Sequence, residues 1–142
     1  MTPSTAARLA GSPEGIGEVR KQYHFRASPD GLLAWDVDRL ITLTRDLQPR
    51  SIPLTEIAEL REPYWHGDGV PPTVEDVAMH CRLIEEADLG YPIILCSRRR
   101  VMDGMHRVAR AFLLGQTHIL AFVLPTDPAP DYVGRAPEDL PY

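Results

Sequence analysis

Long apolar runs, cysteine and lysine are all scarce in this sequence. Its 142 residues contain no stretch that approaches the about 18 consecutive apolar residues of a membrane-spanning helix, and residues 1–10 lack the basic and apolar regions of a secretory signal. The only two cysteines, Cys81 and Cys96, lie in apolar surroundings without C-x-x-C spacing, as expected of reduced, buried thiols. These features predict a cytoplasmic protein that does not enter a membrane.

Positive charge is also limited. Basic residues number 15 against 20 acidic ones, which gives a formal net charge of -5, and all the basic residues except Lys21 are arginines. Nucleic-acid affinity comes mainly from cationic patches that release counterions, so DNA is not a favoured partner. A local basic patch is still compatible with this composition. Hydrophobic residues make up 44% and charged residues 25%, which is ordinary for a soluble globular protein of one domain.

The two ends of the chain differ in composition from its middle. Residues 1–17 contain two prolines and few large apolar side chains, which predicts a flexible arm. Five of the 14 prolines fall between Pro125 and Pro141, a density that opposes both helix and central strand. We therefore predict an extended tail over residues 125–142, which wraps either the domain or a partner subunit. The second alternative would make the protein a homodimer.

The first half of the middle carries signals for short elements. We predict a strand over residues 19–27 and a turn over residues 28–31, where proline and glycine fit the turn angles. Asp36 is expected to cap a helix that ends near Asp46, and residues 51–54 to form a strand. Thr55 is then expected to cap a helical turn that Pro63 stops.

The second half is more regular. A capping arrangement of Thr73 and Asp76 predicts a helix that ends near Gly90. Residues 91–102, with a basic turn at 97–100, predict a hairpin or a bent strand pair, and residues 118–124 a closing strand. Between them, Asp103 is expected to cap a helix over residues 104–114. The side chains expected to face inward are Val74, Val77, Ala78, Cys81 and Ile84 in the first helix and Met105, Val108, Ala109, Phe112 and Leu113 in the second, with Gly115 ending the latter.

This mixture of helices and strands, without a long crossover helix between every strand pair, predicts a compact α+β or mixed α/β fold with a small mixed sheet.

The most informative segment is Val-Met-Asp-Gly-Met-His-Arg at residues 101–107, where a strand runs directly into a helix. A helix N-terminus presents free backbone N–H groups and the positive end of the helix dipole, which together favour a phosphate or carboxylate. Gly104 would let a ligand approach the backbone, and Met105 would contribute mainly its N–H. The segment therefore predicts an anion site.

Three ionisable side chains of this segment could take part in chemistry. Arg107 could clamp phosphate oxygens with its planar fork, and His106 could donate to phosphate or move a proton. Asp103 could cap the helix, hold a magnesium ion or accept a proton from a hydroxyl. The same residues also fit a purely structural role. Asp-Gly before a helix is often only a cap and a turn, and a helical arginine is commonly a surface charge.

The order of segments from residue 51 onward resembles the ParB/sulfiredoxin-like superfamily. The resemblance rests on Pro-Ile-Ile-Leu at residues 92–95, the basic turn, residues 101–115 and residues 118–124, and residues 51–57 resemble the opening strand and turn of ParB N-terminal domains. Members of the superfamily place a G-x-[HR]-R motif at a helix N-terminus against nucleotide phosphates. The resemblance implies such a domain over residues 51–124, with residues 18–50 as an extension that packs on it.

Differences between the branches of this superfamily narrow the expected activity. Sulfiredoxins carry their catalytic cysteine where this chain has Met105, so sulfiredoxin activity is not expected. Partition-type ParB proteins have Gly-Glu-Arg-Arg in this place, bind CTP and continue into DNA-binding and dimerisation domains, for which the 18 residues after Leu124 leave no room. The motif is most similar to Asp-Gly-His-His-Arg of archaeal ADP-dependent free serine kinases. By that resemblance Glu62, at a matching distance from Ile52, would activate a substrate hydroxyl.

A loop over residues 61–72 combines aromatic and ionisable side chains. Tyr64 and Trp65 could stack on a base or line a pocket, although tryptophan is more commonly a core residue. His66 and Asp68 have ligand-like chemistry, but neither an HExxH nor a Cys/His zinc pattern accompanies them. We expect the part of this loop from Glu62 to Asp68 to form the second, substrate-binding wall of the site.

The remaining charged and histidine residues carry weaker signals. Arg100 and its two arginine neighbours could steer a nucleotide or a nucleic-acid strand, although such turns are commonly only solvated. We expect His24, His80 and His118 to be structural or surface residues.

The leading hypothesis is a domain that binds a nucleotide (ATP, ADP or CTP) or another phosphorylated small molecule with Mg2+ at residues 103–107, assisted by Arg100. If it is an enzyme, it would transfer a phosphoryl group to a small hydroxylated substrate, with Glu62 or Asp103 as the base and His106 as a further catalytic candidate. The alternative is a non-catalytic adaptor that contacts proteins or DNA through its basic turn and proline-rich tail.

Overall fold

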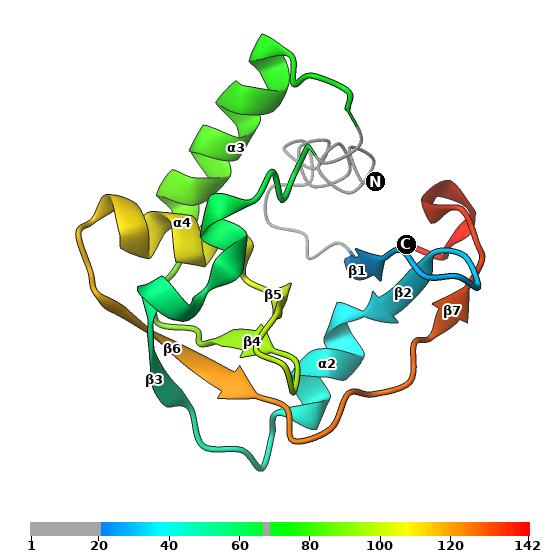
Figure 1. Ribbon diagram of the computed structural model, residues 1–142, viewed down its shortest axis with the longest axis horizontal. Coiled ribbons are helices and arrows are strands. Elements are labelled where there is room, and N and C mark those ends of the chain that lie inside the picture. Colours follow the sequence, from blue (N-terminus) through cyan, green and yellow to red (C-terminus); the bar gives the residue numbers. More distant parts are fainter. Residues whose placement is uncertain (1–20, 67–68) are drawn as a thin grey trace.

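The computed structural model describes residues 21–66 and 69–142, which form two sheets and three α-helices (Figure 1). This α+β architecture confirms the predicted fold class. The predicted arm over residues 1–17 and the candidate residue Asp68 lie outside the described residues. The elements in chain order are β1 (Tyr23–Arg26), β2 (Leu33–Asp36), α2 (Val37–Leu43), β3 (Arg50–Pro53), two 3-10 helices (Leu54–Glu56 and Ala58–Arg61), α3 (Val74–Glu86), β4 (Ile93–Leu95), β5 (Val101–Asp103), α4 (Met105–Leu113), β6 (His118–Val123), β7 (Tyr132–Val133) and a 3-10 helix (Pro137–Asp139).

The larger sheet has the strand order β3-β6-β4-β5. β6 pairs with β3 in antiparallel fashion, with Ile119 opposite Ile52, and with β4 in parallel, with Ala121 opposite Ile93. A parallel pair needs a crossover connection, which β5 and α4 supply. The predicted hairpin of β4 and β5 is confirmed, since these strands pair directly. The hairpin and crossover deliver the end of β5 to the start of α4.

Two cores lie on opposite faces of this sheet. On one face, Ile93 and Ile119 pack with Met105 and Val108 of α4 and with Ile57 between the 3-10 helices. Burial of such side chains stabilises the fold by about 1.5–3 kcal/mol each. The other face carries a second cluster from β2, α2 and the sheet, formed by Trp35, Leu40, Ile94, Cys96, Met102 and Leu124.

The smaller sheet, of order β1-β2-β7, is completed by residues after position 125. Leu140 is buried against Tyr23, whose hydroxyl donates to the carbonyl oxygen of Pro141. Trp35 Nε1 donates to the carbonyl oxygen of Pro128 at 2.8 Å. The expected extended tail therefore also contains the short strand β7 and a 3-10 helix, and it returns to the beginning of the described chain (Figure 1).

Several predicted local signals are confirmed. Gly31 N–H donates to the carbonyl of Ser28 and closes the predicted turn. Asp36 caps α2, and Thr73 begins α3 with a complete capping box in which Thr73 and Asp76 exchange hydrogen bonds. Gly115 follows α4 with φ +76°. Each signal depends on bonds between close neighbours in sequence.

Other local predictions are wrong. β2 was not predicted, and α2 ends at Leu43, before Asp46. Thr55 does not cap a helical turn, because the N-cap positions of the two 3-10 helices are occupied by Pro53 and Ile57. Gly90 does not end α3, whose C-cap is Ala87, and Gly104, not Asp103, is the N-cap of α4. The reason at Asp103 is a competing ion pair, described below.

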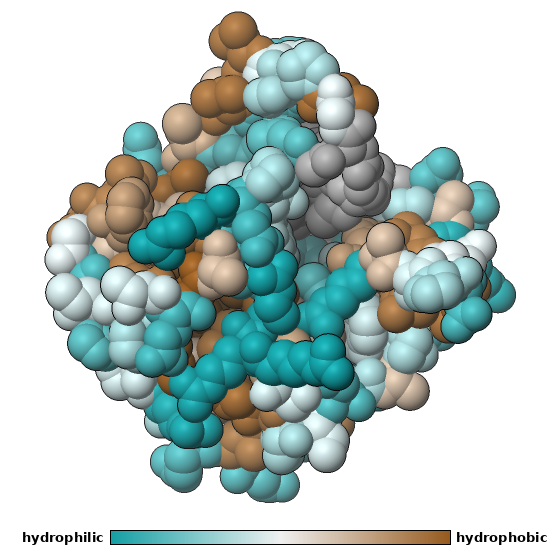
Figure 2. All heavy atoms as spheres, in the orientation of Figure 1, coloured by the Kyte–Doolittle hydropathy of each residue, from teal (hydrophilic) through white to brown (hydrophobic). Residues whose placement is uncertain are grey.

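The inward face predicted for α3 is also wrong. Val74 is 87% exposed, Val77 and Cys81 are exposed too, and the one fully buried residue of the helix is His80. At the end of α4, Phe112 and Leu113 are exposed, whereas Ala111 is buried. Figure 2 shows apolar side chains over the tip of α3 and the outer end of α4. Among the described residues, no helix is both long and apolar enough to cross a membrane.

The capping box provides a stability test. Replacing Thr73 by alanine removes the acceptor for Asp76 N–H, which should lower the free energy of unfolding by about 1 kcal/mol. Thr55→Ala is the matched control, because Thr55 makes no cap bond, and should change it by less than about 0.5 kcal/mol. Urea unfolding measures both, and equal losses would contradict the assignment.

Candidate functional site

The start of α4 is built on a glycine in the left-handed region. Gly104 has φ +105°, and a Cβ at this position would lie 2.6 Å from Cγ2 of Ile93. A side chain is therefore excluded both by backbone conformation and by the close approach of β4. No side chain caps α4, and Val108 is the first residue whose N–H donates to an earlier helical carbonyl, that of Gly104. The first-turn amides remain available to a ligand.

Arg107 fixes this junction from inside the first turn. Its Nη2 donates to Oδ2 of Asp103 at 2.8 Å, and its Nη1 donates to the carbonyl oxygens of Tyr91 and Pro92, each at 3.0 Å. The Asp103 carboxylate is thereby held away from the amides that it was expected to cap. Burial raises the pKa of Asp103, against the opposing effect of the Arg107 charge.

Two histidines and a tryptophan meet beside the first turn of α4. His80 of α3 and His106 of α4 are joined by a hydrogen bond of 2.8 Å between Nδ1 of His80 and Nε2 of His106. We call these two residues the imidazole pair. Trp65 stacks over both rings, with centroid distances of 4.4 Å to His80 and 4.5 Å to His106. His66 meets His80 edge-on at 5.4 Å.

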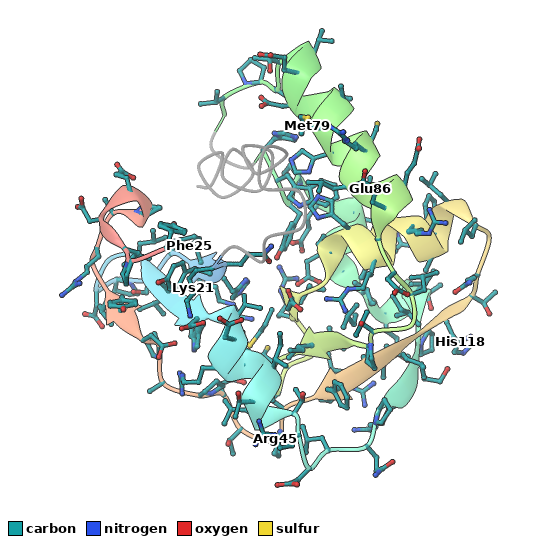
Figure 3. The ribbon with its side chains drawn as sticks, turned by 180° about the vertical axis from the view of Figure 1, so that it is seen from behind. Lys21, Phe25, Arg45, Met79, Glu86 and His118 are labelled. Atoms are coloured by element: carbon teal, nitrogen blue, oxygen red, sulfur yellow. The ribbon has the colours of Figure 1, made fainter. Side chains whose placement is uncertain are left out.

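A cavity of about 420 Å³ opens at this place, and we call it the helix cavity. Its polar lining is uneven. Arg107 and the α4 amides lie on one side, whereas Glu86 and Asp88 lie at the end of α3, where Figure 3 shows Glu86 beside α4. The sequence-predicted residues in its wall are Tyr64, Trp65, Asp103, Gly104, Met105, His106 and Arg107. The cavity thus combines a helix N-terminus with aromatic walls and a mostly acidic rim.

Glu62 and Arg100 line a different, neighbouring cavity of about 520 Å³, which we call the glutamate cavity. Nη1 and Nη2 of Arg100 donate to the two carboxylate oxygens of Glu62 at 2.9 and 2.7 Å. These bonds lower the pKa of Glu62. Both oxygens of the expected base are therefore occupied in this arrangement. His24 and Tyr64 line both cavities.

The basic turn is largely neutralised. Arg99 pairs with Glu56 at 3.1 Å, and Arg100 also contacts Glu59 at 3.2 Å. Arg98 has no ion pair with any residue that the structure describes. Two of the three charges expected to steer a ligand are thus already balanced within the protein.

Three polar residues at or beside these cavities were not assigned to a site from the sequence: Glu59 and His24, which line them, and His80, which does not. Glu59 is 2% exposed and accepts the backbone N–H of Val101, while its Oε1 has no partner among the described residues. His24 accepts a hydrogen bond from Arg26. Both His24 and His80 were expected to be structural or surface residues. A charged residue within the apolar segment at residues 57–60 was the one available signal, since uncompensated burial of a charge is costly.

The described residues do not form a protein-held metal centre. No group of three or more histidine, cysteine, aspartate or glutamate side chains among residues 21–66 and 69–142 could hold a metal ion. Asp103, the expected metal ligand, is bound by Arg107. Magnesium commonly arrives with substrate phosphates and takes only one or two carboxylates, so the expectation of Mg2+ stays a prediction tied to the ligand.

Gly104 gives a direct test of the junction. Gly104→Ala introduces both left-handed strain and the clash with Ile93, and should lower the free energy of unfolding by about 2–4 kcal/mol. Gly115→Ala is the matched control, because Gly115 also has positive φ but open space around its Cβ position, and should cost about 1 kcal/mol. Similar losses in urea unfolding would argue against the close approach of β4.

The buried histidines predict a pH dependence of stability. Burial lowers the pKa of His24 and His106 to about 3 and that of His80 to about 4. The unfolded chain then binds more protons between about pH 6.5 and pH 4, so stability falls as the pH falls through this window, by up to about 1.4 kcal/mol per pH unit for each histidine. Urea unfolding at several pH values measures the slope. His24→Asn should reduce the slope, and a slope equal to that of the wild type would contradict the effect assigned to the burial of His24.

Comparison with known proteins adds no assignment to this geometry. No family model matches the chain, and neither a curated protein nor a solved structure matches it. The resemblance to the ParB/sulfiredoxin-like superfamily therefore stays a prediction.

Proposed function

We propose that this protein binds a nucleotide or another phosphorylated small molecule in the helix cavity. The observation that carries the proposal is the first turn of α4, which begins at a glycine, has no side-chain cap and opens into a cavity. Free amides and the helix dipole favour negative charge there. Tyr64 and Trp65 supply the aromatic surface that a base or an apolar ligand group would contact.

The charges around the cavity indicate how the ligand would be bound. Asp103 is balanced by Arg107, and Glu86 pairs with Arg82 at 3.5 Å outside the cavity, which leaves Asp88 as the rim carboxylate without an ion pair among the described residues. The Asp88 carboxylate would oppose a bare phosphate, and a cation that accompanied the phosphate would offset this repulsion. This supports Mg2+ as a companion of the ligand, held mainly by phosphate oxygens and water.

Phosphoryl transfer is a further step of the same proposal. Glu62 would need to leave Arg100 before it could act as a base, and it lies in the glutamate cavity. Asp103 would need to leave Arg107. The arrangement therefore supports ligand binding more directly than it supports transfer to a hydroxylated substrate.

Binding is tested by thermal shift with ATP, ADP, CTP and GTP, each with magnesium. A ligand at 100 times its dissociation constant should stabilise the protein by about 2.7 kcal/mol, which is a melting shift on the order of 10 °C for this chain length. Two exposed rim side chains, those of Glu86 and Tyr91, can be changed in charge, and only the backbone carbonyl of Tyr91 contacts Arg107. Glu86→Gln should tighten binding about twofold to threefold at low salt, and Tyr91→Asp should weaken it by a similar factor.

Glu85→Gln is the control, because Glu85 is exposed on the same helix but does not line the helix cavity. A gain of affinity in Glu86→Gln is informative because structural damage would produce a loss. Failure of every nucleotide to shift the melting of the folded wild type would contradict nucleotide binding and favour the adaptor alternative, and a further failure of inorganic sulfate to bind would contradict the anion site as a whole.

A further inference from the structure

The hydrogen bond within the imidazole pair restricts the protonation of both rings. Nδ1 of His80 lies 2.8 Å from Nε2 of His106, and the rings are inclined by only 21°. A hydrogen bond between two nitrogens needs one N–H and one bare nitrogen. In the neutral pair both rings must therefore have the same tautomer. They are both Nδ1–H if His80 donates, and both Nε2–H if His106 donates.

The burial of Nε2 of His80 selects between these two states. His80 is 4% exposed, and its Nε2 is inaccessible and has no hydrogen-bond partner among the described residues. If His106 donated, this nitrogen would carry a hydrogen without an acceptor. Buried N–H groups without an acceptor are rarer than buried acceptors without a donor. The state in which His80 donates is therefore favoured.

The surroundings keep the pair uncharged in the free protein. Burial opposes a charge on either ring, as do His66 beside His80 and Arg107 beside His106, whereas Asp76 on α3 acts in the opposite direction. Charging both rings would also place hydrogens on both facing nitrogens and break the bond. Trp65 covers both rings, so each is held in place by stacking as well as by the hydrogen bond.

We propose that His80 is a positioning residue that holds His106 as its Nδ1–H tautomer, so that His106 offers a neutral hydrogen-bond donor to an anionic ligand in the helix cavity. His106 lines the cavity and His80 does not. The role in ligand binding rests on the proposed function, but the tautomer itself does not. In this state His106 has no free basic nitrogen, so it donates to the anion and does not act as a base.

The tautomer is tested by imidazole 15N NMR of the free protein near neutral pH. We expect both His80 and His106 to be Nδ1–H, with assignments made from the signals that disappear in His80→Asn and His106→Asn. His24 is an internal reference, because Arg26 donates to its Nε2 and leaves the hydrogen on Nδ1. Spectra that show Nε2–H in either member of the pair, or different tautomers in the two, would overturn the inference.

The positioning role is tested by the affinity for inorganic sulfate, whose charge does not change near neutral pH. The side-chain amide introduced by His80→Asn can still donate to Nε2 of His106, so this variant should bind sulfate like the wild type. His80→Phe keeps a ring beneath Trp65 but loses the donor, and should bind about three- to tenfold more weakly, with mixed His106 tautomers in NMR. His118→Asn, far from α3 on β6, should have no effect (Figure 3).

The outcomes separate the two proposals. If sulfate and the nucleotides fail to bind the wild type, the proposed function is wrong, and the NMR spectra alone decide the tautomer. If sulfate binds the wild type and His80→Phe equally, the anion site stands and the positioning role of His80 is wrong.

Discussion

The fork of Arg107 is the interaction on which the candidate site depends. One guanidinium binds the Asp103 carboxylate at the end of β5 and two backbone carbonyls just before β4, so the helix start is fixed relative to two strands at once. As a consequence, some polar groups of the first turn are bound within the protein and others are free to meet a ligand. Because Arg107 is occupied by the protein and Asp103 is occupied by Arg107, the polar groups of this turn left for an anion are the backbone amides and His106.

The features predicted correctly from sequence are those whose bonds join close neighbours. The capping box at Thr73, the turn closed by Ser28 and the glycine after α4 each depend on partners within about four residues, which a sequence pattern displays directly. Asp103 shows where such rules stop. Its type and position fit an N-cap, but an arginine one turn later offers its carboxylate a stronger, charged partner.

The features missed by sequence analysis depend on partners far apart in the chain. His80 is buried because it meets His106, 26 positions later, and Trp65, and this turns α3 so that valines of its apolar stripe face outward. Glu59 is buried because it accepts the N–H of Val101, 42 positions later. Helical periodicity measures only how apolar a face is. It cannot reveal that a polar side chain has a hydrogen-bond partner in the interior of the protein.

The return of residues 128–141 to the first sheet has a consequence for biosynthesis. Tyr23 lines the helix cavity, yet Leu140 and the carbonyl of Pro141 hold it in place, and β2 gains its second neighbour only from Tyr132 and Val133. During translation, β4, β5 and α4 can therefore assemble before this wall exists. A growing chain that has already made the start of α4 still lacks the contacts that hold Tyr23 in the cavity wall until residues near Leu140 leave the ribosome.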